Sequence, residues 1–400
     1  MELLAQHGFG NGEKIIRALN KGLIKGAIFS AKDVSPAKVA DALEEIEAEH
    51  PQGVRMFDPQ FYASMIAAQP GARLGYLGGD EAHSYFEPRR RRDLEREQQV
   101  RKDLTAVIAY QQKLAVSAII APNIVIRRAF DSVEGTVSKN FLRNAAPIAA
   151  ELGESRPVYA TLAISSPALA DRIELQNFLQ EITEIDEPPT GFYLLLEKPD
   201  SGIAATLTEP DILSRWMLVN YILKTSGFRI INGYTDALSP YVGAAGSDAV
   251  ATGWYNTLKT FSLKKFEPVS EFSRRPVARY LSRVLLKSIR HTELHDLRRP
   301  FPEVLNGLSC DDYYDEDEGS APDAAGEALQ NWEGIGLLNK IVAAGDVRAS
   351  LTSCRSALDR AEELYARIRH YGLTMRDRSG AGHVDMIREE LNSFEHLAEL

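Results

Sequence analysis

Short runs of apolar residues recur between residues 22 and 282, and most of them are separated by segments with helical periodicity. Each run has the length and composition of a strand and is bounded by glycine, proline or polar residues. The predicted strands are residues 22–30, 53–59, 116–123, 156–165, 191–199, 228–233, 247–254 and 274–282. The segments between them predict helices at residues 36–50, 89–114, 138–153, 167–185 and 209–227.

This alternation predicts an α/β fold. Continuous apolar strands joined by helical crossovers indicate a parallel sheet that is covered on both faces. Eight such units favour a closed (β/α)8, TIM-like barrel, and an open doubly wound sheet is the alternative. No strand is predicted before the glycine-rich GFGNG at residues 8–12, which argues against a dinucleotide-binding turn at that point.

The pattern changes after about residue 290. Asp311 to Glu318 is rich in acidic residues, which predicts an exposed connection. Amphipathic helices are then expected at residues 350–372 and 383–400. The predicted organisation is therefore a barrel over 1–290, an acidic connecting segment over 291–324 and a C-terminal helical extension over 325–400.

Composition limits the partners that the protein can have. The 400 residues are 44% hydrophobic and 26% charged, with a formal net charge of −10. This acidity argues against non-specific attraction to nucleic acid or to an anionic membrane, although a local basic groove stays open as an alternative. Cys310 and Cys354 cannot build a disulfide framework, and no apolar run reaches the roughly 18 residues of a membrane span. We therefore expect a cytoplasmic protein without membrane association.

Polar residues follow most of the predicted strands. In a TIM barrel the carboxyl ends of all strands share one face, where active sites lie. Asp58, Glu197 and Asp236 are the candidate acid, base or nucleophile. The candidate substrate-binding residues are Lys32, Asn123, Lys198, Asn232, Trp254 and Lys259. For each residue the alternative is a structural role, since Asp and Asn at strand ends also cap helices.

The spacing of residues adds to the analysis at three places in the chain. Glu197 and Lys198 are neighbours in one strand, so they should point to opposite faces. The segment 257–268 combines three lysines with Phe261 and Phe266, which suggests either a phosphate-binding loop or amphipathic packing.

His291 and His295 are four residues apart, and Cys310 follows. This is not a standard zinc spacing, so surface histidines are favoured and no metal or cofactor is predicted.

The layout resembles that of the tRNA-guanine transglycosylase-like superfamily. The similarity lies in the loop GYLGGDEAHS at 75–84, the unit AAGSDAVATGW at 244–254, and the later segment that contains the two histidines and Cys310. Members of this superfamily are (β/α)8 barrels that exchange a base through a covalent intermediate between an aspartate and a ribose carbon. The resemblance covers the architecture of residues 23–320. The family's zinc-binding C-x-C-x-x-C is absent, and no catalytic residue is transferred.

Two functions from different classes follow. The first is a TIM-barrel enzyme acting at a glycosidic or phosphate-bearing centre, transglycosylase-like, on a small-molecule or nucleic-acid-derived substrate. The second is a non-catalytic barrel subunit of a multi-protein assembly that binds a protein partner through the C-terminal helices. The sequence leaves open whether the protein is an enzyme.

Overall fold

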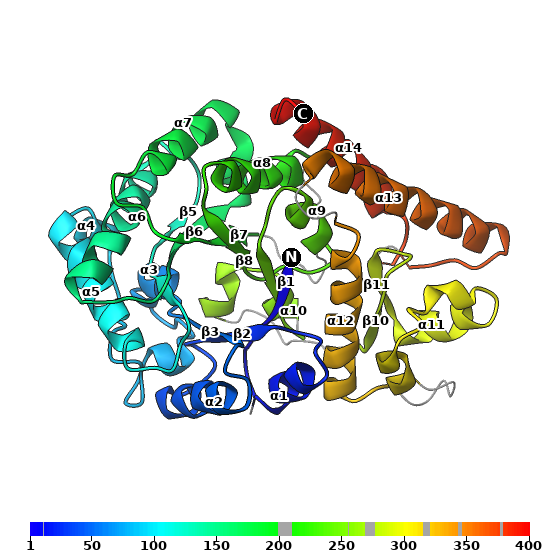
Figure 1. The fold of residues 1–400 in the computed structure, drawn as a ribbon, viewed down its shortest axis with the longest axis horizontal. Coiled ribbons are helices and arrows are strands. Elements are labelled where there is room, and N and C mark those ends of the chain that lie inside the picture. The colour runs from blue at the N-terminus through cyan, green and yellow to red at the C-terminus, as the bar shows by residue number, and fades with distance from the viewer. Residues whose placement is uncertain are drawn as a thin grey trace.

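A nearly closed parallel barrel forms the main body of the protein (Figure 1). The computed structural model describes residues 1–10, 12–198, 210–254, 256–268, 277–314, 321–342, 346–376 and 379–400. The strand order is β3-β2-β1-β9-β8-β7-β6-β4, and every neighbouring pair on this path is parallel. The predicted TIM-like fold class is therefore confirmed.

The eight barrel strands are short and deeply buried. Their bounds are β1 (Glu2–Gln6), β2 (Gly26–Ser30), β3 (Val54–Asp58), β4 (Ile119–Ala121), β6 (Val158–Ser165), β7 (Gly191–Glu197), β8 (Arg229–Asn232) and β9 (Ala249–Thr252). A further two-residue strand, β5 (Val125–Ile126), pairs with the end of β6. All residues of β2 and β6 are buried, as expected for strands covered on both faces.

Helices surround the ring of strands (Figure 1). The longer ones are α1 (Glu13–Asn20), α2 (Pro36–Glu49), α5 (Glu97–Gln111), α6 (Val133–Glu151), α7 (Arg172–Thr183), α8 (Ile212–Thr225) and α9 (Ser239–Ala244). Shorter elements are η1 (Phe61–Ala63), α3 (Ser64–Ala67), η2 (Gly75–Leu77), α4 (Arg91–Leu94), η3 (Ser166–Ala170), α10 (Asn256–Lys259) and η4 (Leu263–Phe266). The long helix predicted over 89–114 is divided into α4 and α5.

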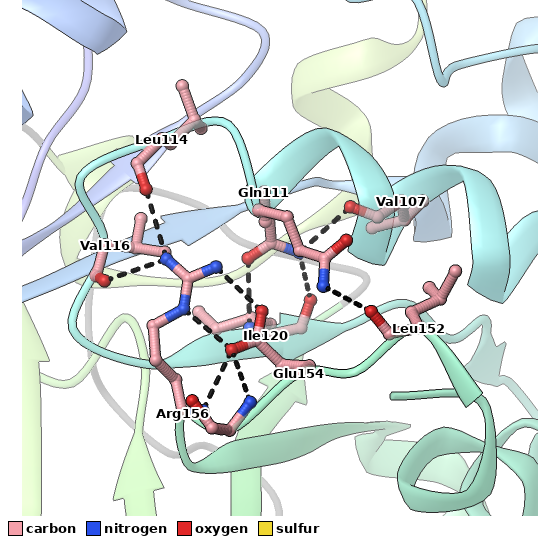
Figure 2. A network of polar contacts seen from close by, with 10 residues as sticks. Val107, Gln111, Leu114, Val116, Ile120, Leu152, Glu154 and Arg156 are labelled. Atoms are coloured by element: carbon pink, nitrogen blue, oxygen red, sulfur yellow. Dashed lines mark hydrogen bonds and ion pairs between the residues drawn. The ribbon is translucent and has the colours of Figure 1, made fainter. Parts of the chain in front are cut away.

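Side chains fill the gap between β3 and β4. The Ser117 backbone N–H donates to the Arg55 carbonyl (2.8 Å), and the Arg55 N–H donates to Ser117 Oγ (2.9 Å). Figure 2 shows Gln111 of α5 hydrogen-bonded to the backbone of Ile120, as a donor at 2.8 Å and as an acceptor at 3.1 Å. The Gln111 amide thus takes the place of a neighbouring strand on that side of β4. In the same figure, Arg156 joins Glu154 to the carbonyls before β4.

Two predictions about the strands are wrong. Residues 2–6, to which no strand was assigned, form β1 at the centre of the sheet, so a strand does precede the glycine-rich GFGNG. The predicted eighth strand is not part of the barrel: β10 (Arg279–Ser282) pairs antiparallel with β11 (Lys287–Arg290) in a separate sheet. Residues 274–276 of that prediction lie outside the described residues. Apolar pattern alone cannot assign a short strand to one sheet or another.

The C-terminal part of the chain packs on the barrel. Its elements are α11 (His291–Arg298), η5 (Pro302–Val304), η6 (Ser309–Tyr313), α12 (Ala324–Asn339), α13 (Val347–His370) and α14 (Gly382–Leu397). Helix α12 contacts β1 and β10, α13 contacts α9, and α14 contacts α8. The indole N–H of Trp332 in α12 donates to the carbonyl of Thr252 in β9 (2.9 Å). The predicted helical extension is therefore present and is anchored to the ring.

The predicted acidic connection is more structured than expected. Its first half contains α11, η5 and η6, and Cys310 and Tyr314 are buried. Residues 315–320, which include much of the acidic run, lie outside the described residues. Within the described part of the chain, no helix combines the length and the apolar character needed to cross a bilayer.

Candidate functional site

Asp58 ends β3 and points into the ring at its carboxyl-terminal face. Its side chain is buried, with 1% exposure. The backbone N–H of Gln60 donates to Oδ1 (2.9 Å), and the hydroxyl of Tyr62 donates to Oδ2 (2.9 Å). The hydroxyls of Tyr193 in β7 and Tyr234 after β8 each lie 3.4 Å from Oδ2. Three phenols from separate segments therefore surround one carboxyl group.

Several effects act on the pKa of Asp58 in opposite directions. Burial raises the pKa of Asp58, whereas the nearby Lys265 ammonium and the hydrogen bonds from Gln60 and the tyrosines lower it. Lys265 Nζ donates to the Tyr234 hydroxyl (2.9 Å) and lies 4.4 Å from the centre of that ring. A carboxyl group with a raised pKa, a cation and several hydroxyls is suited to accept and return a proton.

The backbone is strained at the same place. Gln60 has φ 49° and Tyr234 has φ 53°, in the left-handed region that residues with a side chain rarely adopt. Their side chains meet, since Gln60 Nε2 lies 3.3 Å from the Tyr234 hydroxyl. Strained backbone of this kind costs about 1–3 kcal/mol per residue and clusters at functional sites. The Asp58 site therefore combines a buried charge with local strain.

Glu197 and Lys198 point to opposite faces of β7, as predicted. Tyr193 reaches Asp58 across the ring, which identifies its face as the inner one, and Glu197 lies on that face four residues later. The Glu197 carboxylate accepts a hydrogen bond from the Ser165 hydroxyl at the end of β6. Lys198 instead lines, with Leu196 and Trp216, a pocket between the strand ends and helix α8.

That pocket brings together three of the predicted residues. Lys198, Asp236 and Lys259 line it, beside Trp216 of α8. Burial lowers the pKa of Lys198 to about 8, and the charge of Asp236 opposes this shift. Lys259 Nζ donates to Asn331 Oδ1 of α12 (2.7 Å). Of the candidate residues, Asp58 and Glu197 thus face the inside of the ring, whereas Lys198, Asp236 and Lys259 line this second pocket.

The amides of two predicted binding residues are held within the fold. Asn123 Nδ2 donates to the Thr161 carbonyl (2.8 Å) and to Ser138 of α6. Asn232 points toward α8, where it accepts from the Trp216 indole (3.0 Å) and donates to Asn220 (2.6 Å). Both amides therefore join strands to the helical layer.

The other two predicted binding residues lie near the start of the chain's first helices. Lys32 forms an ion pair with Asp33 (3.4 Å) and stays partly buried. Trp254 is buried, and its ring lies edge-on to His7 and to Trp332. Neither residue approaches Asp58 through a hydrogen bond among the described residues.

The segment after β9 covers the centre of the ring. Phe261 and Phe266 are buried, and Phe261 lies edge-on to Tyr62 with ring centres 4.8 Å apart. Packing, rather than phosphate binding, therefore explains the two phenylalanines. Lys264 is exposed, whereas Lys265 belongs to the Asp58 site.

The histidine and cysteine positions do not form a metal centre in the described residues, where no group of three or more potential ligands occurs. The expectation of two surface histidines is wrong for His291, which is buried against the ring of Tyr314. His291 starts α11 and packs into the C-terminal part of the chain.

Sequence reasoning missed the three tyrosines that surround Asp58. Tyr62 lies between the strand predicted at 53–59 and the helix predicted at 89–114, where no element is predicted, and Tyr193 is an ordinary strand residue by pattern. A signal existed for Tyr234, because it directly follows the strand predicted at 228–233. No local signal indicates that all three phenols meet at one carboxyl group.

Comparisons with known proteins find similarity in structure but not in sequence. No family model matches the chain, and no curated protein matches it in sequence. Among solved structures, a glycosyl hydrolase described as a GH3 family member from Mycobacterium smegmatis str. MC2 155 is similar at a TM-score of 0.38. The two chains are 13% identical, and the match covers 62% of this chain and 82% of the other. A likeness this low transfers neither residue roles nor substrate.

Proposed function

We propose that this TIM-barrel protein is an enzyme that acts at a glycosidic or phosphate-bearing centre and that Asp58 exchanges a proton with, or attacks, the reacting group. The observation that supports this proposal is the convergence at Asp58 of a buried carboxyl with raised pKa, three phenol hydroxyls and two strained residues. Burying an ionisable group costs free energy, and so does strained backbone. Their occurrence together is typical of a functional site.

The arrangement suits cleavage of a bond to an electron-poor carbon or phosphorus. An ionised Asp58 provides a base or a nucleophile, and a phenol such as Tyr62 provides a hydrogen-bond donor that keeps its proton, because burial raises its pKa well above the usual value. Lys265 supplies positive charge beside Tyr234, where a developing anion would be stabilised. The predicted resemblance to transglycosylases agrees with this chemistry and stays a prediction.

A substrate screen tests the proposal. Purified protein is assayed with panels of chromogenic glycosides, nucleosides and phosphate esters, and each hit is repeated with Asp58→Asn. We expect turnover in one class and at least a hundredfold loss in the variant, in line with removal of a proton-transfer group. Asp103→Asn is the matched control, because Asp103 is equally buried but lies on α5 in the helical layer. Full activity in Asp58→Asn, or no turnover with any panel, contradicts the proposal.

A specific observation favours a second function, a non-catalytic barrel in a multi-protein assembly. Several predicted binding groups are already hydrogen-bonded within the fold, including Asn123, Asn232 and Lys259. Light scattering of the purified protein, followed by affinity purification from its native host, tests this function. A defined complex formed equally by wild type and Asp58→Asn, together with an inactive wild type, would favour the assembly role.

A further inference from the structure

The pocket between the strand ends and α8 contains two ionisable groups, Lys198 and Asp236, that the proposed function does not use. It lies at the carboxyl-terminal ends of β7 and β8, against helices α8 and α9. Lys198 comes from the end of β7 and Asp236 from the loop after β8. Both line the pocket, and the charge of Asp236 raises the pKa of Lys198, yet no ion pair or hydrogen bond joins them in the described structure.

Asp236 has an oxygen that lacks a partner. Its Oδ1 is shielded from solvent and has no hydrogen-bond donor among the described residues. Leaving a buried acceptor unsatisfied costs about 1–3 kcal/mol, which a bound donor would recover. Asp236 and Lys198 therefore line one cavity in which a bound group could donate to the free carboxylate oxygen.

Lys198 is held firmly at the edge of this cavity. Its backbone N–H donates to the Phe261 carbonyl (3.0 Å), and the preceding Glu197 forms a parallel bridge with the same residue. The indole N–H of Trp216 is committed to Asn232 (3.0 Å), so Trp216 contributes an apolar wall rather than a hydrogen-bond donor. An amine in apolar surroundings is the usual way in which proteins make lysine nucleophilic.

The size of the pocket limits its occupant. Its empty volume is about 490 Å³ when the open solvent at its mouth is included, but the space in which the centre of a water-sized group fits is only about 30 Å³. That interior holds one or two water-sized groups. A two-carbon compound fits, and larger ligands would extend into the opening.

We propose that this pocket is a second site, in which Lys198 forms an imine with a small aldehyde or ketone while Asp236 transfers the proton. The neutral amine of Lys198 attacks the carbonyl carbon, a C–N bond forms, and the carbonyl oxygen becomes a hydroxyl with the proton that leaves nitrogen. The Asp236 carboxylate then takes the remaining N–H proton and passes it to this hydroxyl, so that the C–O bond breaks, water leaves, a C=N bond to Nζ forms and the carboxylate is regenerated. The reaction consumes amine and carbonyl and yields imine and water, without any oxidant or reductant.

The charge state of Lys198 agrees with this role. With its pKa lowered to about 8, roughly one tenth of the amine is neutral at pH 7, compared with roughly one part in 3,000 for a lysine at 10.5. Lower basicity also reduces intrinsic nucleophilicity, so we expect a net advantage of about tenfold or more over an exposed lysine. Asp58 does not line the pocket, although Tyr234, whose hydroxyl lies beside Asp58, does, so the two sites share a wall but not their reacting groups.

Reductive trapping tests the inference. The full-length native protein is incubated with acetaldehyde and cyanoborohydride, which reduces the imine to a stable amine, and labelled lysines are quantified by peptide mass spectrometry. Lys198 should be labelled at least tenfold faster than exposed Lys113 at neutral pH, and unfolding in urea should remove this preference. Labelling of Lys198 no faster than that of Lys113 overturns the proposal.

Variants separate the roles of the two residues. Asp236→Asn should shift the pH of half-maximal labelling at Lys198 downward, because the carboxylate raises the pKa of the lysine, and should lower the plateau rate at least fivefold. An unchanged pH profile and plateau overturn the role of Asp236. Lys198→Met must lose the label at this peptide while keeping the wild-type melting temperature. Asp58→Asn should leave labelling unchanged, so failure of the proposed barrel activity and failure of this site are distinguishable.

Discussion

Replacing Tyr62 by phenylalanine measures the charge on Asp58 through protein stability. Tyr62 is 2% exposed and donates its hydroxyl to the Asp58 carboxyl at 2.9 Å. A hydrogen bond to a charged group contributes about 1.5–3 kcal/mol, compared with about 0.5–1.5 kcal/mol for a bond between neutral groups. We therefore expect Tyr62→Phe to lower the free energy of unfolding by about 2 kcal/mol at neutral pH.

Tyr85→Phe is the matched control. Tyr85 is 5% exposed and donates to the backbone carbonyl of Pro59 at 2.6 Å, so its partner is neutral and does not titrate. Removing this hydroxyl should cost about 1 kcal/mol at every pH. Both variants delete one buried phenol oxygen, so effects on packing and on the unfolded chain cancel when their losses in unfolding free energy are compared. The remaining difference of about 1 kcal/mol reports the charge on Asp58.

The difference in stability between Tyr62→Phe and wild type should also change with pH in a definite direction. Burial raises the pKa of Asp58, and the Tyr62 hydroxyl lowers it, so Tyr62→Phe raises this pKa further. Over the range in which Asp58 titrates, the folded variant then binds more protons than the folded wild type. The stability of the variant must therefore fall relative to wild type as pH rises, and the difference from Tyr85→Phe must shrink toward zero as pH falls.

Urea unfolding between about pH 4 and about pH 8 provides the assay, with calorimetry as a check. For a chain of this length, 1 kcal/mol corresponds to a shift in melting temperature of about 1 °C. Equal losses for Tyr62→Phe and Tyr85→Phe at all pH values would refute the reasoning, because they would mean that Asp58 is uncharged, or that Tyr62 does not bond to it.

Three further predictions test other parts of the structure. Lys265→Met removes a charge that lowers the pKa of Asp58, so the pH profile of any Asp58-dependent activity should move to higher pH, whereas the exposed Lys264→Met should leave the profile in place. Arg89→Ala should reduce the free energy of unfolding in urea by about 3 kcal/mol, because it leaves the carboxylate of Asp103 buried without its 2.6 Å ion pair; a loss under 1 kcal/mol contradicts this. Trp332→Phe breaks the bond from α12 to β9 and should cost about 2 kcal/mol while speeding limited proteolysis of the C-terminal helices; unchanged cleavage rates would show that this bond does not anchor them.

The barrel could be predicted from the sequence because its signals are local. Seven of the predicted runs coincide with barrel strands, and the helices between them follow from apolar periodicity and from prolines such as Pro36 at the start of α2. The opposite orientation of Glu197 and Lys198 also follows from strand geometry alone. Asp58 could be placed at a strand end, since Pro59 cannot continue the ladder.

Strand order could not be predicted in the same way. Residues 2–6 and 279–282 are both short apolar runs, but the first pairs with β2 and β9 inside the barrel and the second forms a hairpin outside it. The choice depends on which partner each strand meets, and that is a property of the folded chain. The direction of Asn232 toward α8 likewise depends on how the helix packs.

The sequence by itself determined seven of the eight barrel strands, the helices between them and the position of Asp58 at the end of its strand, because these depend on residues within a few positions of each other. Only the tertiary structure decided that Tyr193 and Tyr234, which lie 135 and 176 residues away, meet the Asp58 carboxyl. It alone also separated Asp58 from the pocket of Lys198 and Asp236. The physical reason is that closing the ring fixes which side chains share its interior, and closure depends on strand order and register rather than on local pattern.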